Sequence, residues 1–257
     1  MKYFSVYITL IVTFLFFACS NDDYANRNSL QDFDYVLVAS STKQTPNHTY
    51  TTTYHYTDYK LNRINYSIDN SYDIYTYTDD LITQIEHFNT EGVITERTVF
   101  EYNSNKDLVR ESSQEVRNDQ VLTFEYGYTY VDNKTIKVDF SSLAENGVVY
   151  EFEKIINLKD QEILNTVYTL NNYTTSFTYD VAKNPFKNIE GYRKLYISEY
   201  FGEKGNLRNV LSKAYGNKKI ENFYRYNVDN YPTEIIEKSY ENNTLKDTEI
   251  ITFEYVQ

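Results

Sequence analysis

The sequence predicts an all-β protein, a curled antiparallel meander of about 14–18 strands built from hairpin repeats of about 25 residues. Three observations support this fold class. The composition favours strands, with 29 Tyr and 15 Phe but only 7 Gly and 3 Pro among 257 residues, because aromatic residues fit a pleated, half-buried surface. A short aromatic motif recurs along the chain. Within the segments that carry it, apolar and polar residues alternate, as in a strand with one buried face.

The recurring motif is an aromatic residue, any residue, and a second aromatic residue. Phe-Glu-Tyr occurs three times, and close variants fill the intervals. The motifs are Tyr54–Tyr56, Tyr75–Tyr77, Phe100–Tyr102, Phe124–Tyr126, Tyr150–Phe152, Phe177–Tyr179, Tyr224–Tyr226 and Phe253–Tyr255, with a looser Glu199-Tyr200-Phe201. Successive motifs lie 21 to 29 residues apart. This interval accommodates two strands and two turns, so each unit is predicted to be a β-hairpin.

Each unit continues from the aromatic pair into a short polar turn and then an aliphatic stretch. Thr57-Asp58-Tyr59-Lys60 precedes Leu61, for example. Pairs that tolerate a positive φ fall between other strand-like runs. They are Asn146-Gly147, Gly205-Asn206, Gly216-Asn217 and Asn242-Asn243. These pairs therefore indicate turns.

The two faces of the expected sheet differ in polarity. In the run VLTFEYGYTYV, the residues Phe124, Tyr126 and Tyr128 point one way, whereas Glu125 and Gly127 point the other. One face is thus aromatic and aliphatic and the other is hydrated. A large sheet of this kind is expected to curl so that it covers its own apolar face.

The repeats resemble the YD repeats of RHS-type proteins, and they are more similar to YD-like lipoproteins of unknown function in Bacteroidota. The resemblance spans residues 33–257, and the segment 179–189, YDVAKNPFKNI, resembles the YD-x-x-x-NPF segment of those lipoproteins. The resemblance implies no catalytic residue. After this segment, helical spacing is followed by Ile189, Tyr192, either Leu195 or Tyr196, and Tyr200. We therefore expect one short helix at 189–201 that caps the sheet.

The N-terminus has the parts of a secretory signal. Residues 4–18 are mostly apolar and follow the single charge of Lys2, but a spanning helix needs about 20 apolar residues. Ala18-Cys19 resembles the lipobox of bacterial lipoproteins, although Phe16 stands where leucine is usual. The resemblance implies cleavage between Ala18 and Cys19, with acylation of the Cys19 thiol. An uncleaved signal anchor is the alternative.

The four residues after the cysteine resemble the acidic export signal of surface lipoproteins in Bacteroidota. They are Ser20, Asn21, Asp22 and Asp23. A hydrated acidic linker is the alternative interpretation. The predicted organisation is a lipoprotein signal peptide at 1–18, an acidic tether at 19–32 and a YD-like repeat β domain at 33–257.

Charge and composition exclude several function classes. Without the signal, 24 basic residues face 37 acidic ones, a net charge of −13, which disfavours nucleic acid as a partner. Cys19 is the single cysteine, so the folded part has neither disulfides nor a thiol nucleophile. The histidines His48, His55 and His87 lack the pairing of a zinc site. Nucleophile-elbow and phosphate-loop motifs are missing from the sequence. We expect no enzyme activity, no metal and no cofactor.

The predicted function is that of a membrane-anchored lipoprotein of the cell envelope, displayed at the outer membrane. Acylated Cys19 would hold it on the bilayer, because two or more acyl chains anchor a protein stably. The tyrosine-rich sheet would bind an extracellular glycan or protein, since tyrosine rings stack and their hydroxyls form hydrogen bonds. Two alternatives stay open: a structural spacer or assembly component of an envelope complex, and a glycan hydrolase with an unrecognised carboxylate pair.

Overall fold

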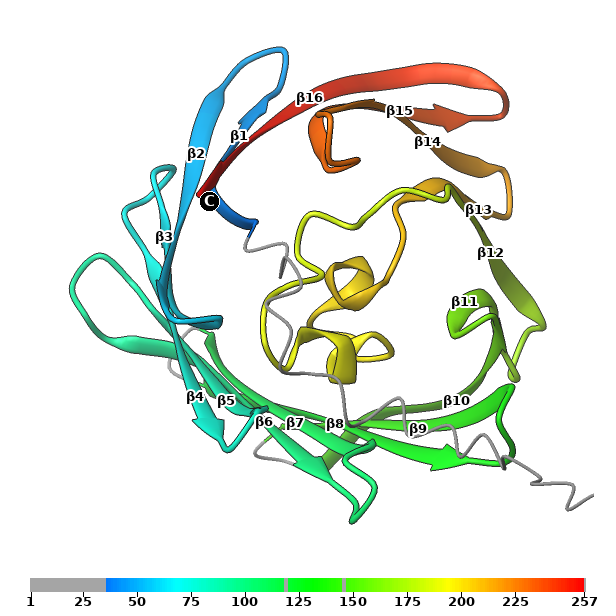
Figure 1. Ribbon diagram of the computed structural model, residues 1–257. Helices are drawn as coiled ribbons and strands as arrows, with labels where there is room; N and C mark the ends of the chain where they lie inside the picture. Colours follow the sequence, from blue (N-terminus) through cyan, green and yellow to red (C-terminus); the bar gives the residue numbers. More distant parts are fainter. Residues whose placement is uncertain (1–35, 118–119, 145–146, 257) are drawn as a thin grey trace, which may run out of the picture. The chain divides into compact units, whose positions relative to one another are not determined.

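The computed structural model describes residues 36–117, 120–144 and 147–256. These residues form sixteen antiparallel strands, arranged as a closed barrel in which each strand pairs with its neighbours in the sequence (Figure 1). The strands are β1 Leu37–Gln44, β2 Thr49–Thr57, β3 Lys60–Tyr66, β4 Tyr72–Thr78, β5 Leu81–Phe88, β6 Ile94–Tyr102, β7 Leu108–Arg117, β8 Gln120–Tyr130, β9 Thr135–Ala144, β10 Gly147–Lys159, β11 Glu162–Tyr168, β12 Tyr173–Tyr179, β13 Val210–Tyr215, β14 Lys218–Tyr226, β15 Pro232–Glu241 and β16 Thr244–Val256.

The expected curled meander is wrong, because the sheet closes on itself. The first strand pairs with the last along its length, from Leu37 opposite Val256 to Gln44 opposite Ile250. Closure leaves no edge strand in the described part of the sheet, and it turns the apolar face toward an enclosed lumen. Hairpin periodicity predicts neighbouring pairs only, so it does not reveal a contact between the two ends of the chain.

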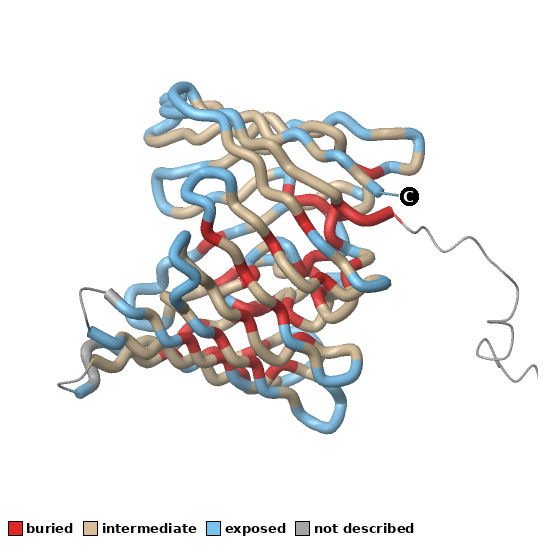
Figure 2. The backbone as a smooth tube through the Cα atoms, turned by 90° about the vertical axis from the view of Figure 1, so that its left-hand side faces the viewer, coloured by how far each residue is buried: buried red, intermediate tan, exposed pale blue. Residues whose placement is uncertain are grey.

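The apolar face of the sheet lines the lumen and the polar face points outward. Leu61, Ile82 and Val138 are fully buried in the core. Charged residues at the alternate positions form ion pairs on the outside, such as Arg97 with Glu86 at 2.7 Å. Figure 2 shows buried segments within the strands and exposed turns at their ends. The alternation read from the sequence therefore describes the inside and outside of a barrel.

The second aromatic residue of the motif lies next to a β-bulge. The pairing register shifts between His55 and Tyr56, and equivalent shifts occur at Tyr77, Tyr102, Tyr179 and Tyr226. Several of these tyrosines donate their hydroxyl to a backbone carbonyl of the preceding, adjacent strand: Tyr56 to Val38 (2.8 Å), Tyr102 to Ile82 (2.7 Å) and Tyr179 to Ile163 (2.9 Å). In these units the motif thus ties its strand to the strand before it, close to the bulge that bends the sheet.

The turns use residues that adopt a left-handed backbone. Asp58 and Asp79 have φ of 54° in the turns that follow the motif, and Asn242 and Asn243 have φ of 51° and 60° between β15 and β16. Asp and Asn tolerate this conformation better than other residues with a side chain. Gly205-Asn206 is different, because it lies inside the barrel and not in a hairpin turn.

The connection between β12 and β13, residues 180–209, folds into the lumen, and we call this segment the plug (Figure 1). Tyr192, Leu195 and Ile197 of the plug are buried in the same core as the wall residues. The expected helix at 189–201 is wrong. Only two 3-10 turns occur in this segment, η1 Tyr192–Leu195 and η2 Gly202–Gly205. The spacing that suggested a helix reflects contacts with a surrounding wall on several sides.

The sites predicted at the N-terminus lie outside the described residues. These are Ala18, Cys19, Ser20, Asn21, Asp22 and Asp23, and the boundaries at 18 and 32 fall there as well. They stay predictions. In the described ranges, no helix is both long enough and apolar enough to cross a membrane.

Candidate functional site

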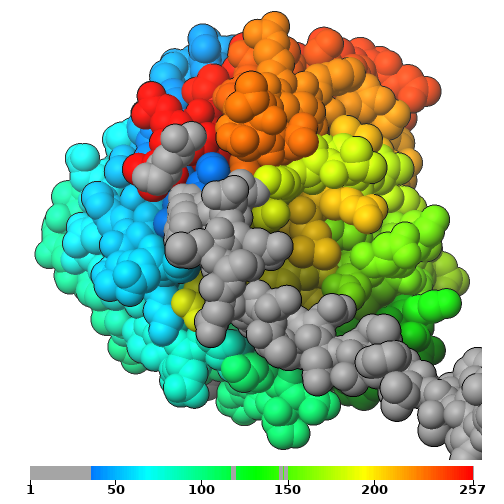
Figure 3. Space-filling model, viewed as in Figure 1, coloured from blue at the N-terminus to red at the C-terminus, as the bar shows by residue number. Residues whose placement is uncertain are grey.

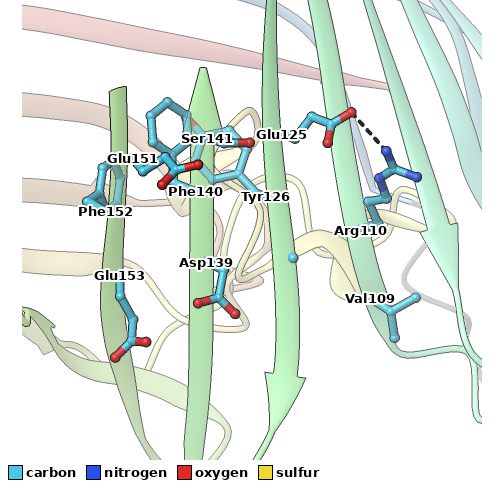
Figure 4. Close-up of a pocket in the computed structure, with 11 residues that line it drawn as sticks. Val109, Arg110, Glu125, Tyr126, Asp139, Phe140, Ser141, Glu151, Phe152 and Glu153 are labelled. Carbon is cyan, nitrogen blue, oxygen red and sulfur yellow. Dashed lines mark hydrogen bonds and ion pairs between the residues drawn. The ribbon is translucent and has the colours of Figure 1, made fainter. Parts of the chain in front are cut away.

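A hollow of about 580 Å³ lies on the outer face of β7 to β10 (Figure 4). It forms where Gly127 leaves a gap between longer side chains. Arg110 and Glu125 face each other at its edge at 2.8 Å. Lys137 binds Asp139 at 3.1 Å on the same face. These are partly exposed ion pairs, which contribute little energy, so this hollow has the character of a hydrated sheet face.

A second set of hollows lies inside the barrel, around the part of the plug that includes η2. Four cavities of about 190, 260, 350 and 530 Å³ share lining residues. Glu199 lines the first and third, Glu203 the first and second, and Tyr168 the first and fourth. The four therefore adjoin, and together they form what we call the lumen chamber. Figure 3 shows the plug, in yellow, between the strands of the wall.

Tyrosines line the largest part of the lumen chamber. Tyr150, Tyr168, Tyr173 and Tyr215 come from β10 to β13, and Lys213 lies among them. Tyr173 is 37 % exposed and meets Tyr168 edge to face, with ring centroids 6.2 Å apart. Such rings offer both an apolar face for stacking and a hydroxyl for hydrogen bonding. This part of the chamber can hold a ligand that is apolar on one side and polar at its edge.

Carboxylates from the wall hold the plug in place. Glu111, which is 1 % exposed, accepts the backbone N–H groups of Glu199 and Tyr200, both at 3.1 Å, and the Tyr128 hydroxyl at 2.9 Å. Burial raises the pKa of the Glu111 carboxyl. Lys154 forms an ion pair with Glu199. The 350 Å³ cavity beside Glu111 is acidic, yet the Glu111 oxygens are already used by the plug.

Glu162 plays the same part on the other side of the plug. One of its oxygens accepts the backbone N–H groups of Leu207 and Arg208, both at 2.9 Å. Arg193 lies 3.8 Å from the other oxygen. Burial raises the pKa of the Glu162 carboxyl, although Arg193 opposes the shift. The plug backbone is therefore fixed to the wall near both ends of η2.

A glycan hydrolase would need two carboxyl groups facing one substrate bond. Three carboxyls inside the barrel have a pKa raised by burial, namely those of Glu111, Glu162 and Glu237. Glu111 and Glu237 line different cavities, and Glu162 lines none of the four. Within the described residues, therefore, no cavity of the lumen chamber combines two carboxyls of raised pKa.

The histidines have separate roles. His55 is exposed on the outer face and lies 2.8 Å from the Asn65 amide, as expected for a residue opposite Tyr54 and Tyr56. His87 points inward and its Nδ1 lies 2.6 Å from buried Asp73. The hydrogen bond with Asp73 raises the pKa of His87. Sequence reasoning missed this pair, because its members lie on neighbouring strands. Over the described ranges, no group of His, Cys, Asp and Glu could hold a metal ion.

Comparison with known proteins adds information on the fold. No family model and no curated protein matches the chain. Among solved structures, a porin-like protein from Bacteroides vulgatus ATCC 8482 aligns with 86 % of this chain and 99 % of its own, with a TM-score of 0.56 and 15 % identity. The two chains share a fold. A porin-like protein from Bacteroides uniformis ATCC 8492 aligns with 85 % of this chain and 84 % of its own, with a TM-score of 0.39 and 11 % identity.

Proposed function

We propose that this protein is a lipid-anchored protein of the outer membrane of a Bacteroidota bacterium, and that it binds a glycan in the lumen chamber of its barrel. The N-terminal resemblance to a lipobox supports the anchor at Cys19, and the acidic residues after it support display at the cell surface. The fold shared with a porin-like protein from Bacteroides vulgatus supports a cell-envelope location.

The polarity of the two faces supports a barrel that stands in water beside the membrane. Barrels that span a bilayer carry an apolar band outside and a polar interior, and a Lys or Arg at the bilayer midplane costs about 2–4 kcal/mol. This barrel is arranged in the opposite way. Outward strand positions carry ion pairs such as Arg110 with Glu125 and Lys137 with Glu153, while the core fills the inside. Membrane contact would then come from the acyl chains.

The partly exposed tyrosines of the lumen chamber are the observation that carries glycan binding. Tyr150 is 54 % exposed and Tyr173 37 % exposed, although both point into the barrel. A protein partner would need a broad accessible surface, whereas these rings lie in a concave space of the kind that holds small ligands. A structural spacer would have no use for such a chamber. Glycan binding therefore accounts for the tyrosines better than either alternative.

The test is glycan binding by the purified full-length protein, with a glycan array followed by calorimetry. Tyr173→Ala should weaken binding roughly 2- to 12-fold, because an aromatic contact contributes about 0.5–1.5 kcal/mol. Tyr72→Ala is the matched control, since Tyr72 stacks on Phe88 on the outer face. Binding that Tyr173→Ala leaves unchanged, or the absence of any glycan ligand, would refute the proposal.

Lipidation is tested separately, by growing cells with labelled palmitate. The label should enter the wild-type protein, and Cys19→Ala should abolish its incorporation together with processing at Ala18. A Cys19→Ala protein that is still labelled would show that the acyl chain is attached elsewhere.

A further inference from the structure

The cavity of about 260 Å³ lies between the plug and the wall strands β1, β2 and β14–β16, and we call it the plug cavity. Aromatic rings form part of its lining. Phe186 of the plug lies edge to face with Phe253 of β16, with centroids 6.2 Å apart, and is tilted against Tyr54 of β2 at 5.7 Å. The volume lies just below the range of about 300–1,000 Å³ typical of drug-sized ligands. The plug cavity therefore fits one small ring better than a chain of several units.

Two buried amide oxygens in this lining have no hydrogen-bond partner among the described residues, Asn209 Oδ1 and Asn222 Oδ1. Asn209 is only 2 % exposed. The orientation of both amides is fixed by their nitrogens. Asn209 Nδ2 donates to Asp180 Oδ2 at 2.9 Å and to the Lys183 carbonyl at 3.1 Å, while Asn222 Nδ2 donates to the Val210 carbonyl at 2.9 Å. Flipping either amide would set oxygen against oxygen.

Both amide oxygens have almost no accessible surface of their own, so they reach the cavity only through a small shift of the side chains. Because a buried acceptor without a donor is unfavourable, a guest that carries hydroxyl or N–H groups would favour that shift. Further polar groups lie around the same space. Glu237 of β15 and Glu203 of the plug supply carboxyl oxygens, and Lys204 supplies an ammonium group. The Lys204 side chain has accessible surface, but this surface faces the lumen and not bulk solvent. Because the surrounding protein disfavours the charged ammonium, the pKa of Lys204 is lowered. The two carboxyl groups disfavour an anionic guest.

We propose that the plug cavity binds a single uncharged sugar ring, the end unit of the glycan that occupies the lumen chamber. The ring would lie with its C–H face against Phe186 and Phe253 and donate a hydroxyl to Glu237. A small shift of the two amides toward the cavity would let Asn209 Oδ1 and Asn222 Oδ1 accept further hydroxyls. Lys204 would donate to a ring hydroxyl. Glu203 lines both the plug cavity and the 190 Å³ cavity beside it, so the following units can continue toward the tyrosines. This inference rests on the proposed function and names the part of the glycan that is recognised.

The experiment uses five free monosaccharides as probes: glucose, galactose, mannose, rhamnose and N-acetylglucosamine. Saturation-transfer NMR on the full-length protein detects contact, and calorimetry gives the affinity. At least one probe should bind. Asn222→Leu should weaken it roughly tenfold or more, since it removes one acceptor and blocks the site. Glu237→Gln should weaken it roughly 2- to 10-fold, since it keeps the side-chain shape and changes only the acceptor.

Thr252→Ala is the matched control, because Thr252 is exposed between Ile251 and Phe253, which line the cavity. It should leave the affinity unchanged. Thermal melting shows whether each variant is folded. If Asn222→Leu does not fold, the affinity of Glu237→Gln for the monosaccharide tests the inference by itself. The inference is overturned if none of the five sugars binds, or if Asn222→Leu or Glu237→Gln, each folded, binds like the wild type. The cavity would then hold water.

The same variants separate this inference from the proposed function. Polysaccharide binding that is lost in Tyr173→Ala but kept in Asn222→Leu and Glu237→Gln would overturn the end-unit site and leave lumen binding intact. A protein that binds neither the monosaccharides nor any glycan of the array would overturn both.

Discussion

Glu111 shows how one inward side chain can join two distant parts of the chain. It belongs to β7, and it receives three hydrogen bonds, two of them from plug residues 88 and 89 positions later in the sequence. An anionic acceptor inside a barrel is stable only when such donors surround it. The sequence marks Glu111 as one acidic residue among 37, and nothing local to it distinguishes it from the hydrated Glu125.

Glu111→Gln should lower the free energy of unfolding by about 1–3 kcal/mol, because one backbone N–H of the plug then faces an amide nitrogen. Urea unfolding measures the change, and hydrogen exchange should accelerate at the amides of Glu199 and Tyr200. Glu125→Gln, on the outer face, should change stability by less than about 0.5 kcal/mol. Equal losses in the two variants would contradict the role given to Glu111.

Glu237 should make stability depend on pH. Burial raises the pKa of Glu237 above the ordinary 4.5, and the negative charges of Glu249 and Glu203 raise it further. The positive charges of Lys43 and Lys213 oppose this shift. A carboxyl whose pKa is raised by folding stabilises the fold below its unfolded pKa, and this contribution is lost as the pH rises through the folded value. Glu237→Gln has no such charge to bury.

The melting temperature of Glu237→Gln should therefore exceed that of the wild type at about pH 8. The difference should vanish at about pH 4, where both side chains are neutral. Thermal scans at the two pH values measure it. A variant that is less stable than the wild type at the higher pH would show that the Glu237 charge is stabilised and not penalised.

At the scale of the element, the recurring aromatic motif has a mechanical role. The first aromatic residue packs in the lumen, and the second lies at a bulge, where its hydroxyl donates to a carbonyl of the preceding strand, as Tyr102 does to Ile82. The turn after it begins with residues such as Asp58 and Asp79, which adopt a positive φ. The repeat therefore encodes a hairpin and also the bend that joins it to its neighbours.

Tyr102→Phe should lower stability by about 0.5–1.5 kcal/mol, because it removes the hydrogen bond to the Ile82 carbonyl and leaves the ring in place. Tyr150→Phe is the control, since Tyr150 is half exposed in the lumen chamber. It should be close to neutral. Denaturant unfolding of both variants measures the effect, and a neutral Tyr102→Phe would remove the role assigned to the motif.

The plug is the element that the sequence describes least well. The YD-x-x-x-NPF segment marks its beginning: Asp180 accepts the N–H groups of Ala182 and Asn209, and Asn184 accepts that of Phe186. The helical spacing of the residues after it does not produce a helix, because Tyr192 and Leu195 are enclosed by a surrounding wall, and a segment enclosed in this way needs no single apolar stripe.

At the scale of the whole molecule, wall and plug form one core. Tyr192, Leu195 and Ile197 are at most 2 % exposed and belong to the same cluster as wall residues such as Ile82 and Phe100. A barrel of sixteen strands is too wide for its own side chains to fill. The plug supplies the missing volume.

Replacement of residues 182–207 by a short Gly-Ser linker should therefore abolish cooperative unfolding and the near-ultraviolet circular dichroism of the tyrosines. Val181→Ser is the control, because Val181 is 95 % exposed, and it should behave like the wild type. A linker variant that melts cooperatively at the wild-type temperature would show that the wall is stable without its plug.

The chain that begins at Ser20 should be folded and monodisperse in the absence of detergent, because its outer face carries ion pairs where a membrane barrel carries an apolar band. Size-exclusion chromatography with light scattering, in the presence and absence of detergent, measures this. Aggregation that only detergent relieves would favour a barrel that inserts into the bilayer.

The sequence by itself determined the local features: the strand composition, the hairpin repeat, the turns at Gly216-Asn217 and Asn242-Asn243, and the division of residues such as Tyr128 and Glu125 between two faces. These depend on backbone preferences and on a period of two, which act within a few residues. Only the tertiary structure decided that β1 meets β16, that the apolar face becomes a lumen, and that 180–209 fills it. Those outcomes depend on contacts between residues far apart in the chain, whose free energy arises from enclosing the whole apolar face and leaving no strand edge unpaired.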